Sequence, residues 1–228
     1  MTNLKISTLV VIALLSASVA LLTGCETSGA AAAGLSSAGK PENVFLATNK
    51  LPADVKRVAI LPLACDAKRA DLAAGREELQ SVLVAELIKT KKFEVVEISP
   101  EEMERLTGQP GWTGAEILPA DFLDALNKAC GCDAVMFCEL TEFRPYPPLA
   151  VGWRLKLVDV RNKETIWAGD EIFVSPQFIA HNAQWADDLG LTTDYGSDAE
   201  NARWLAANSP RQFGENSVAS LLNTLPAR

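Results

Sequence analysis

Arg57-Val58-Ala59-Ile60-Leu61-Pro62-Leu63 is a nearly continuous apolar run that ends at a proline, and it decides the fold class. An apolar run without polar alternation is typical of a strand that is covered on both faces. Residues 76–90 follow with apolar side chains at helical spacing, and residues 93–98 resemble a second strand. The apolar face of the intervening helix is expected at Leu79, Val82, Leu83, Leu87 and Ile88. The sequence therefore predicts a strand, a covering helix and a second strand.

Further helices and strands are expected along the chain. Ser99-Pro100 is typical of a helix start, with a capping residue followed by a proline in the first turn. Residues 121–129 carry another apolar helical face, and residues 133–143 begin as an apolar run that turns into alternation. This order predicts a β-α-β-α-β arrangement.

Residues 151–158 alternate apolar and polar side chains, as a half-buried strand does. A turn at 161–163 leads to strand segments over 165–169 and 171–174. Together with the strand before them, these segments are expected to form an antiparallel meander. We therefore expect an α/β fold with a three-layer-like mixed sheet and C-terminal helices packed on it.

The C-terminal part, residues 176–228, has helical patterns. Ser209 and Gln212 have the spacing of a capping box, and the apolar residues that follow repeat at helical spacing. We expect this last helix to pack on the sheet; a free-standing helix that binds a partner is the alternative. An earlier helical segment, after Ser175, contains His181.

Leu22-Thr23-Gly24-Cys25 follows an apolar segment and resembles a bacterial lipobox. The resemblance implies that residues 1–24 are a signal peptide and that Cys25 becomes acylated, for example with palmitate, which anchors the protein to a membrane. Glu26 is not the aspartate that favours inner-membrane retention, so it favours a periplasm-facing site on the outer membrane. An ordinary secretory peptide with an incidental cysteine is the alternative.

Residues 25–52 are expected to be the lipidated cysteine and a flexible tether, because this stretch is rich in glycine, serine and alanine. Residues 53–228 then form a single α/β domain with its core over 55–175. The whole chain has a formal net charge of −8, and loss of Lys5 with the signal peptide makes the balance more negative. This charge argues against nucleic acid as a partner.

Several phrases together resemble a superfamily of envelope lipoproteins. They are the strand 57–63, Lys92-Phe93-Glu94-Val95-Val96, Cys132-Asp133-Ala134-Val135, and the stretch from Leu155 through Trp167. The superfamily includes the curli-secretion lipoprotein CsgG, the lipoprotein activators of penicillin-binding proteins such as LpoB, and the N-terminal domain of TolB. The resemblance covers about residues 55–175 and implies an α/β domain that binds envelope proteins without catalytic residues.

The sequence departs from the curli channel because it lacks a pair of additional amphipathic segments that would insert into the outer membrane. A subunit of a ring-forming secretion apparatus is therefore the second hypothesis, and an oligomer remains an open possibility. The first hypothesis is a lipid-anchored periplasmic accessory protein that recruits or regulates another envelope protein.

A catalytic or cofactor site is not expected. The chain has one histidine, His181, without a candidate nucleophile nearby, and it has no glycine loop that would cradle phosphate. Adjacent carboxylates such as Glu101 and Glu102 are interpreted as surface residues. We therefore predict a protein that is not an enzyme and that holds no cofactor and no metal.

Four cysteines besides Cys25 leave three alternatives open: structural disulfides, free thiols, and metal or redox chemistry. They are Cys65, Cys130, Cys132 and Cys138. Cys65 is expected to come near Cys138 if the two strands run parallel. The close pair Cys130 and Cys132 is the basis of a third hypothesis, a thiol- or metal-handling envelope protein.

The best candidate for a partner-binding surface is the stretch from Phe143 to Leu149. Its candidate contact residues are Phe143, Tyr146, Pro147 and Pro148. The prolines stiffen the loop and Tyr146 can act as an anchor. The alternative is a plain hairpin connection whose aromatic residues cover the sheet edge.

Overall fold

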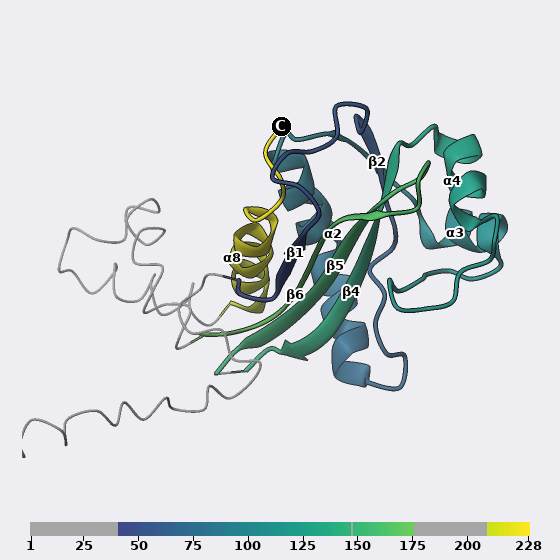
Figure 1. The fold of residues 1–228 in the computed structure, drawn as a ribbon. Helices are drawn as coiled ribbons and strands as arrows, with labels where there is room; N and C mark the ends of the chain where they lie inside the picture. The colour runs from purple at the N-terminus through teal and green to yellow at the C-terminus, as the bar shows by residue number, and fades with distance from the viewer. Residues whose placement is uncertain (1–40, 147, 176–208) are drawn as a thin grey trace, which may run out of the picture. The chain divides into compact units, whose positions relative to one another are not determined.

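The computed structural model describes residues 41–146, 148–175 and 209–228 (Figure 1). The predicted signal peptide, Cys25, His181 and the helical segments expected between 176 and 208 lie outside these ranges. The elements are β1 (Val44–Leu46), β2 (Arg57–Ile60), α2 (Ala70–Lys89), β3 (Glu94–Glu97), α3 (Pro100–Thr107), α4 (Phe122–Cys130), β4 (Ala134–Arg144), β5 (Ala150–Asp159), β6 (Thr165–Val174) and α8 (Pro210–Leu222). None of the helices in the described ranges is long and apolar enough to cross a bilayer.

In the described ranges the strands form one mixed sheet of six strands in the order β1-β6-β5-β4-β2-β3. β2 is parallel to both of its neighbours, with Val58 opposite Val95 on β3 and Ala134 on β4. The pairs β4–β5, β5–β6 and β1–β6 are antiparallel. The predicted α/β fold, with its β-α-β-α-β start and antiparallel meander, is confirmed.

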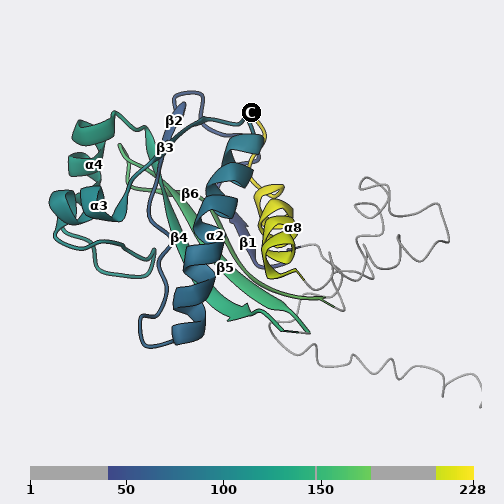
Figure 2. The same ribbon diagram turned by 180° about the vertical axis from the view of Figure 1, so that it is seen from behind.

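Helices on both faces of β2 explain its continuous apolar run. Val58 and Ile60 belong to the core beneath α2 and α8, whereas Ala59 and Leu61 belong to the core beneath α3 and α4. Successive side chains of a strand point to opposite faces, so both sets must be apolar. Figure 2 shows α2 and α8 side by side in front of the sheet, with α3 and α4 set apart from them.

The predicted tether, residues 25–52, ends too late, because its last residues belong to the folded domain. Residues 44–46 form β1, with Phe45 opposite Ala168 on β6, and Lys50 forms an isolated bridge with Ala227. Three apolar residues are too few to show a period of two, but the open edge of β6 supplies hydrogen-bonding partners for them. The folded domain therefore begins before residue 53.

The helix α2 begins at Ala70, earlier than the predicted residue 76, and it buries Leu72 and Gly75 in its added turns. At its other end Ile88 is 56% exposed, so the expectation that this residue belongs to the apolar face is wrong. The remaining predicted apolar residues are buried. The sequence predicts a later start because glycine disfavours helix interiors, and Gly75 lies within the first turns of α2.

The helix α8 packs on the sheet, as predicted. Ser209 caps it by accepting a hydrogen bond from the Gln212 backbone N–H at 3.3 Å. The indole of Trp153 on β5 donates to Ser217 Oγ at 2.8 Å, and the indole of Trp167 on β6 donates to Thr224 Oγ1 at 3.0 Å. Two tryptophans of the sheet therefore hold the C-terminal helical segment.

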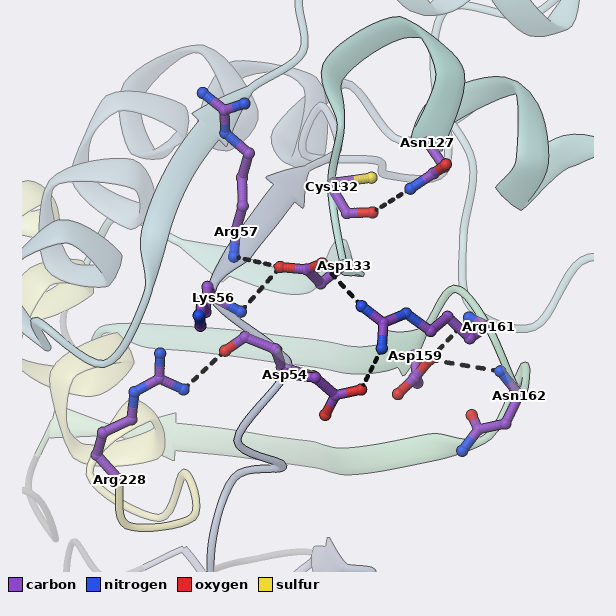
Figure 3. A network of polar contacts seen from close by, with 11 residues as sticks. Asp54, Lys56, Arg57, Asn127, Cys132, Asp133, Asp159, Arg161, Asn162 and Arg228 are labelled. Carbon is purple, nitrogen blue, oxygen red and sulfur yellow. Dashed lines mark hydrogen bonds and ion pairs between the residues drawn. The ribbon is translucent and has the colours of Figure 1, made fainter.

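A polar network connects the amino ends of β2 and β4 with the β5–β6 turn (Figure 3). The Asp133 carboxylate accepts hydrogen bonds from the backbone N–H groups of Lys56 and Arg57, at 2.9 and 3.0 Å. Arg161 donates to Asp133 at 3.5 Å and to Asp54 at 2.6 Å. Burial opposes ionisation of Asp133, but the two N–H groups and the nearby positive charges outweigh it and hold its pKa below the ordinary value. This network fastens one end of the sheet.

Candidate functional site

One part of the sheet lacks a covering helix on the side of α3 and α4, as far as the described residues go. The core beneath α3 and α4 includes residues of β2, β4 and the end of β5, but none of β6 or β1. We call the surface beside this core the open face. It consists of Phe45, Glu139, Arg154, Lys156, Ala168 and Asp170, and it borders the buried Phe137 of that core. Phe45 is 53% exposed there, which is unusual for a phenylalanine.

Strand pairing arranges the open face in two rows. The first row crosses four strands and places Phe137, Lys156, Ala168 and Phe45 opposite one another. The second row crosses three strands and consists of Glu139, Arg154 and Asp170. The open face therefore combines an apolar row that contains one lysine with a row of charged residues.

In the charged row, one cation pairs with two carboxylates. Arg154 donates to Glu139 at 3.2 Å and to Asp170 at 2.8 Å. These contacts, the hydrogen bond to Asp170 foremost, raise the pKa of the Arg154 guanidinium. Lys156 has no carboxylate within ion-pair distance in the described ranges; its Nζ donates to the backbone oxygen of Gly114 at 3.2 Å. Lys156 therefore contributes an uncompensated positive charge.

The connection between α3 and α4 crosses the open face at Gly114. A Cβ atom on Gly114 would lie 3.1 Å from Lys156 Cδ and 3.6 Å from Phe137 Cβ, so the backbone here touches the sheet. Hollows of about 410 and 300 Å³ lie along this contact, and both are lined in part by Gly114, Phe137 and Lys156. The two hollows share these three lining residues, and we call the two together the open-face groove.

Aromatic packing makes the floor of the groove rigid. Phe137 stacks on Phe122 with ring centroids 5.9 Å apart, and Phe122 meets Trp112 edge to face at 5.3 Å. The Trp112 indole donates to Thr107 Oγ1 at 2.8 Å, which fixes its orientation. A floor that is packed before binding lowers the entropic cost of binding a ligand.

A second, wider cleft of about 870 Å³ lies at the carboxyl ends of β2 and β3. Here β2 leads to α2 on one face and β3 leads to α3 on the other, so the cleft lies where ligands often bind in α/β folds. Gln80 crosses it, accepting from the Leu63 N–H at 2.7 Å and donating to Glu97 at 3.0 Å. Its remaining charged side chains, among them Arg76 and Glu77, are exposed.

All four cysteines in the described ranges are free thiols, so the disulfide considered between Cys65 and Cys138 is not formed. The two strands do run parallel, and the Ala64 N–H donates to the Cys138 oxygen at 2.9 Å. Cys138 is fully buried, and burial raises its pKa. Burial, together with contact with Cys130, raises the pKa of Cys132 to about 12. High pKa values make these buried thiols poor nucleophiles and metal ligands.

Metal binding receives no support from the described residues, because they contain no group of three or more histidine, cysteine or carboxylate side chains that would hold an ion. Cys130 instead donates to the Leu126 oxygen at 3.0 Å, within its own helix α4. Cys65 is half-buried at the wider cleft, and burial raises its pKa. Cys130 therefore ends α4 and Cys132 lies just before β4, whereas Cys138 lies within β4.

The predicted partner-binding loop is only partly available. Phe143 is 4% exposed and lies beneath α2, so the interpretation of this residue as a contact for a partner is wrong. Gly75 allows this packing, because a Cβ there would approach Phe143 Cδ1 to 2.8 Å. Tyr146 is 75% exposed and Pro148 is exposed, whereas Pro147 lies outside the described residues. Tyr146 therefore remains a candidate contact, separate from the open-face groove.

The sequence contained a partial signal for the open-face groove. Alternation over 151–158 already assigned Arg154 and Lys156 to the polar face of a half-buried strand. Nothing local in the sequence shows that Phe45 joins the same face or that Gly114 crosses it, because both depend on contacts between distant segments. The groove was therefore missed.

No family model matches the chain, and no curated protein matches it closely enough to count as a relative. Several solved structures are similar to part of the chain. The PelC dodecamer from Paraburkholderia phytofirmans is 16% identical with a TM-score of 0.45, over 81% of this chain and 98% of that chain. Lipoprotein GNA1162 from Neisseria meningitidis is 18% identical with a TM-score of 0.38, over 60% of this chain and 99% of that chain.

The C-terminal domain of LpoB from Escherichia coli is 17% identical with a TM-score of 0.35, over 52% of this chain and 82% of that chain. Two of these three similar structures are thus described as a lipoprotein or as LpoB. At such low identities and TM-scores we take neither a family nor a function from them.

Proposed function

We propose that this protein is a lipid-anchored accessory protein of the bacterial envelope that binds another envelope protein without catalysis. The observation that carries the binding role is the open-face groove, with an exposed phenylalanine and a preformed aromatic floor beside an uncompensated lysine. Exposed aromatic side chains with a polar surround are characteristic of protein-binding surfaces. The lipobox at Leu22–Cys25 supports the anchoring role.

The position of β1 supports a link between anchor and groove. β1 follows the glycine- and alanine-rich segment after Cys25, and it supplies Phe45 to the groove. A short connection between a membrane anchor and a binding surface raises the local concentration of membrane-bound partners. A partner in the same envelope layer therefore fits this arrangement.

Replacing the acylated residue tests the anchor. We expect the wild-type protein in the outer-membrane fraction and the Cys25→Ser variant in the soluble periplasmic fraction, because the acyl chains are lost. Labelling with radioactive palmitate should mark the wild type alone. A Cys25→Ser variant that still fractionates with membranes after residues 1–24 have been removed would contradict the proposed anchor.

Site-specific photo-crosslinking in cells tests the groove. A photoreactive amino acid at position 45 should capture a discrete envelope protein, whereas the same amino acid at position 88 should not. Ile88 is a matched control for Phe45, because the two residues are 56% and 53% exposed and lie on opposite sides of the sheet. Equal capture at both positions, or none at position 45, would refute the groove as the binding surface. A captured second copy of the chain would instead favour the ring-forming hypothesis.

A further inference from the structure

The charges around the open-face groove are unlike those of the chain as a whole. The chain has a net charge of −8, yet the charged side chains that line the two hollows are Arg154, Lys156, Lys163 and one carboxylate, Asp170. Asp170 and Glu139 already pair with Arg154. Lys156 and Lys163 have no ion-pair partner in the ranges that the structure describes, so the lining of the two hollows carries a net positive charge.

The apolar lining lies next to these two cations. The larger hollow, about 410 Å³, is lined mainly by apolar side chains; these are Leu118, Pro119, Ala120, Phe122, Leu123, Phe137 and Val158. Lys156 and Lys163 line the same hollow. The smaller hollow, about 300 Å³, is lined by Phe45 and Ala168, with Lys156 at the boundary between the two. Each hollow therefore offers an apolar surface beside a cation.

The shape favours a polypeptide over an acyl chain or a membrane. The two hollows share Gly114, Phe137 and Lys156 in their lining, and both are open to solvent, so neither is an enclosed tunnel. An acyl chain in an open groove would remain half exposed to water, whereas the polar backbone of a peptide tolerates such exposure. A bilayer surface is too broad to enter the groove.

We propose that the open-face groove binds an extended acidic segment of a partner protein. Its carboxylates meet Lys156 and Lys163, and its apolar side chains enter the two hollows. This inference rests on the proposed function and adds the chemistry of the partner. Opposite charge accelerates encounter and selects the partner, and the hollows supply the apolar contacts.

Peptide binding to the mature chain from residue 25 tests this inference, with Cys25→Ser used to remove the acyl chains. The probe is a short fluorescent peptide in which glutamates alternate with phenylalanine and leucine, and its matched control has lysine in place of every glutamate. We expect saturable binding of the acidic peptide by fluorescence anisotropy and none of the basic peptide. Raising the salt concentration should weaken binding by screening the charges.

Charge reversal assigns the binding to the groove. The Lys156→Glu/Lys163→Glu variant should lose about tenfold or more in affinity, whereas Lys68→Glu, at an exposed position outside the groove lining, should bind as the wild type does. If the double variant fails to fold, Lys156→Gln/Lys163→Gln should show the same direction of effect. Equal binding of both peptides, or unchanged affinity of a folded double variant, would overturn the inference.

A vesicle control separates membrane binding from peptide binding. The same unacylated chain should not bind vesicles of phosphatidylglycerol, and vesicle binding without acidic-peptide binding would overturn the inference. Failure of the proposed function is recognised separately: crosslinking at position 45 would then capture no protein. Capture at position 45 without any preference for acidic peptides would remove only the inference about partner chemistry.

Discussion

Removing one buried hydroxyl should measure how firmly α8 is held to the sheet. Trp153 donates its indole N–H to Ser217 Oγ at 2.8 Å, and both residues are 0% exposed. Ser217→Ala leaves this indole donor without its partner and without access to water. A buried unsatisfied donor costs about 1–3 kcal/mol, and the higher helix propensity of alanine returns about 0.5 kcal/mol. We therefore expect a net loss of about 1–2 kcal/mol.

A second indole provides the matched comparison. Trp167 donates to Thr224 Oγ1 at 3.0 Å, but Thr224 is only partly buried. Trp167 is itself 0% exposed, but its acceptor Thr224 borders solvent, so a small displacement in the Thr224→Val variant gives water access to the indole donor. We therefore expect a loss of less than about 1 kcal/mol. The order of the two free-energy losses is therefore the sharper part of the prediction, because Ser217 is fully buried and Thr224 is not.

Equilibrium unfolding in urea, followed by tryptophan fluorescence and circular dichroism, measures both free energies of unfolding. The dependence on urea concentration should stay as in the wild type, since neither change alters the surface exposed on unfolding. Binding of the acidic peptide should also be unchanged, because α8 lies on the face opposite the groove. A Ser217→Ala variant as stable as the wild type, or a costlier Thr224→Val, would refute the reasoning.

Two further stability predictions concern the ends of the sheet. Asp133→Asn should cost about 1–2 kcal/mol at neutral pH, because the carboxylate accepts two backbone hydrogen bonds and has a lowered pKa in the folded state. That contribution is present above the ordinary value of 3.8 and is lost as the pH falls through the folded-state pKa, so urea unfolding at several pH values should show the two stabilities converging in acid. Gly75→Ala should lower the melting temperature although alanine favours helices, because its Cβ would lie 2.8 Å from Phe143 Cδ1 and 2.9 Å from Leu140 Cδ2; overpacking costs of about 1–3 kcal/mol exceed a propensity gain of about 1 kcal/mol. A more stable Gly75→Ala variant would contradict this packing.

Much of the fold could be predicted from short stretches of sequence. The apolar run at 57–63 indicated a strand between two layers, and the structure places Val58 and Ala59 in different cores. The caps at Ser99 and Ser209 form the predicted hydrogen bonds with the backbone N–H groups of Glu102 and Gln212. Such signals succeed because they depend on neighbours within one turn or one strand.

The candidate site was harder to predict, since its parts come from distant segments. Phe45 falls in the predicted tether and Phe143 in the predicted binding loop, but the structure places Phe45 in β1 and buries Phe143. The apolar character of both residues is visible in the sequence. Phe143 is buried because Gly75 of α2 leaves room for it, and Phe45 is exposed because β1 pairs with the free edge of β6. Exposure of a single apolar residue is therefore a tertiary property.

The sequence by itself determined the order of helices and strands, the doubly covered first strand and the polar face that carries Arg154 and Lys156. Only the tertiary structure decided that β1 joins the sheet, that Gly114 crosses the open face, and that the hollows beside it lie next to unpaired lysines. The physical reason is that side-chain periodicity records which side of an element faces apolar surroundings. It does not record which distant segment lies there, because that depends on the edges and faces left uncovered once the core has packed.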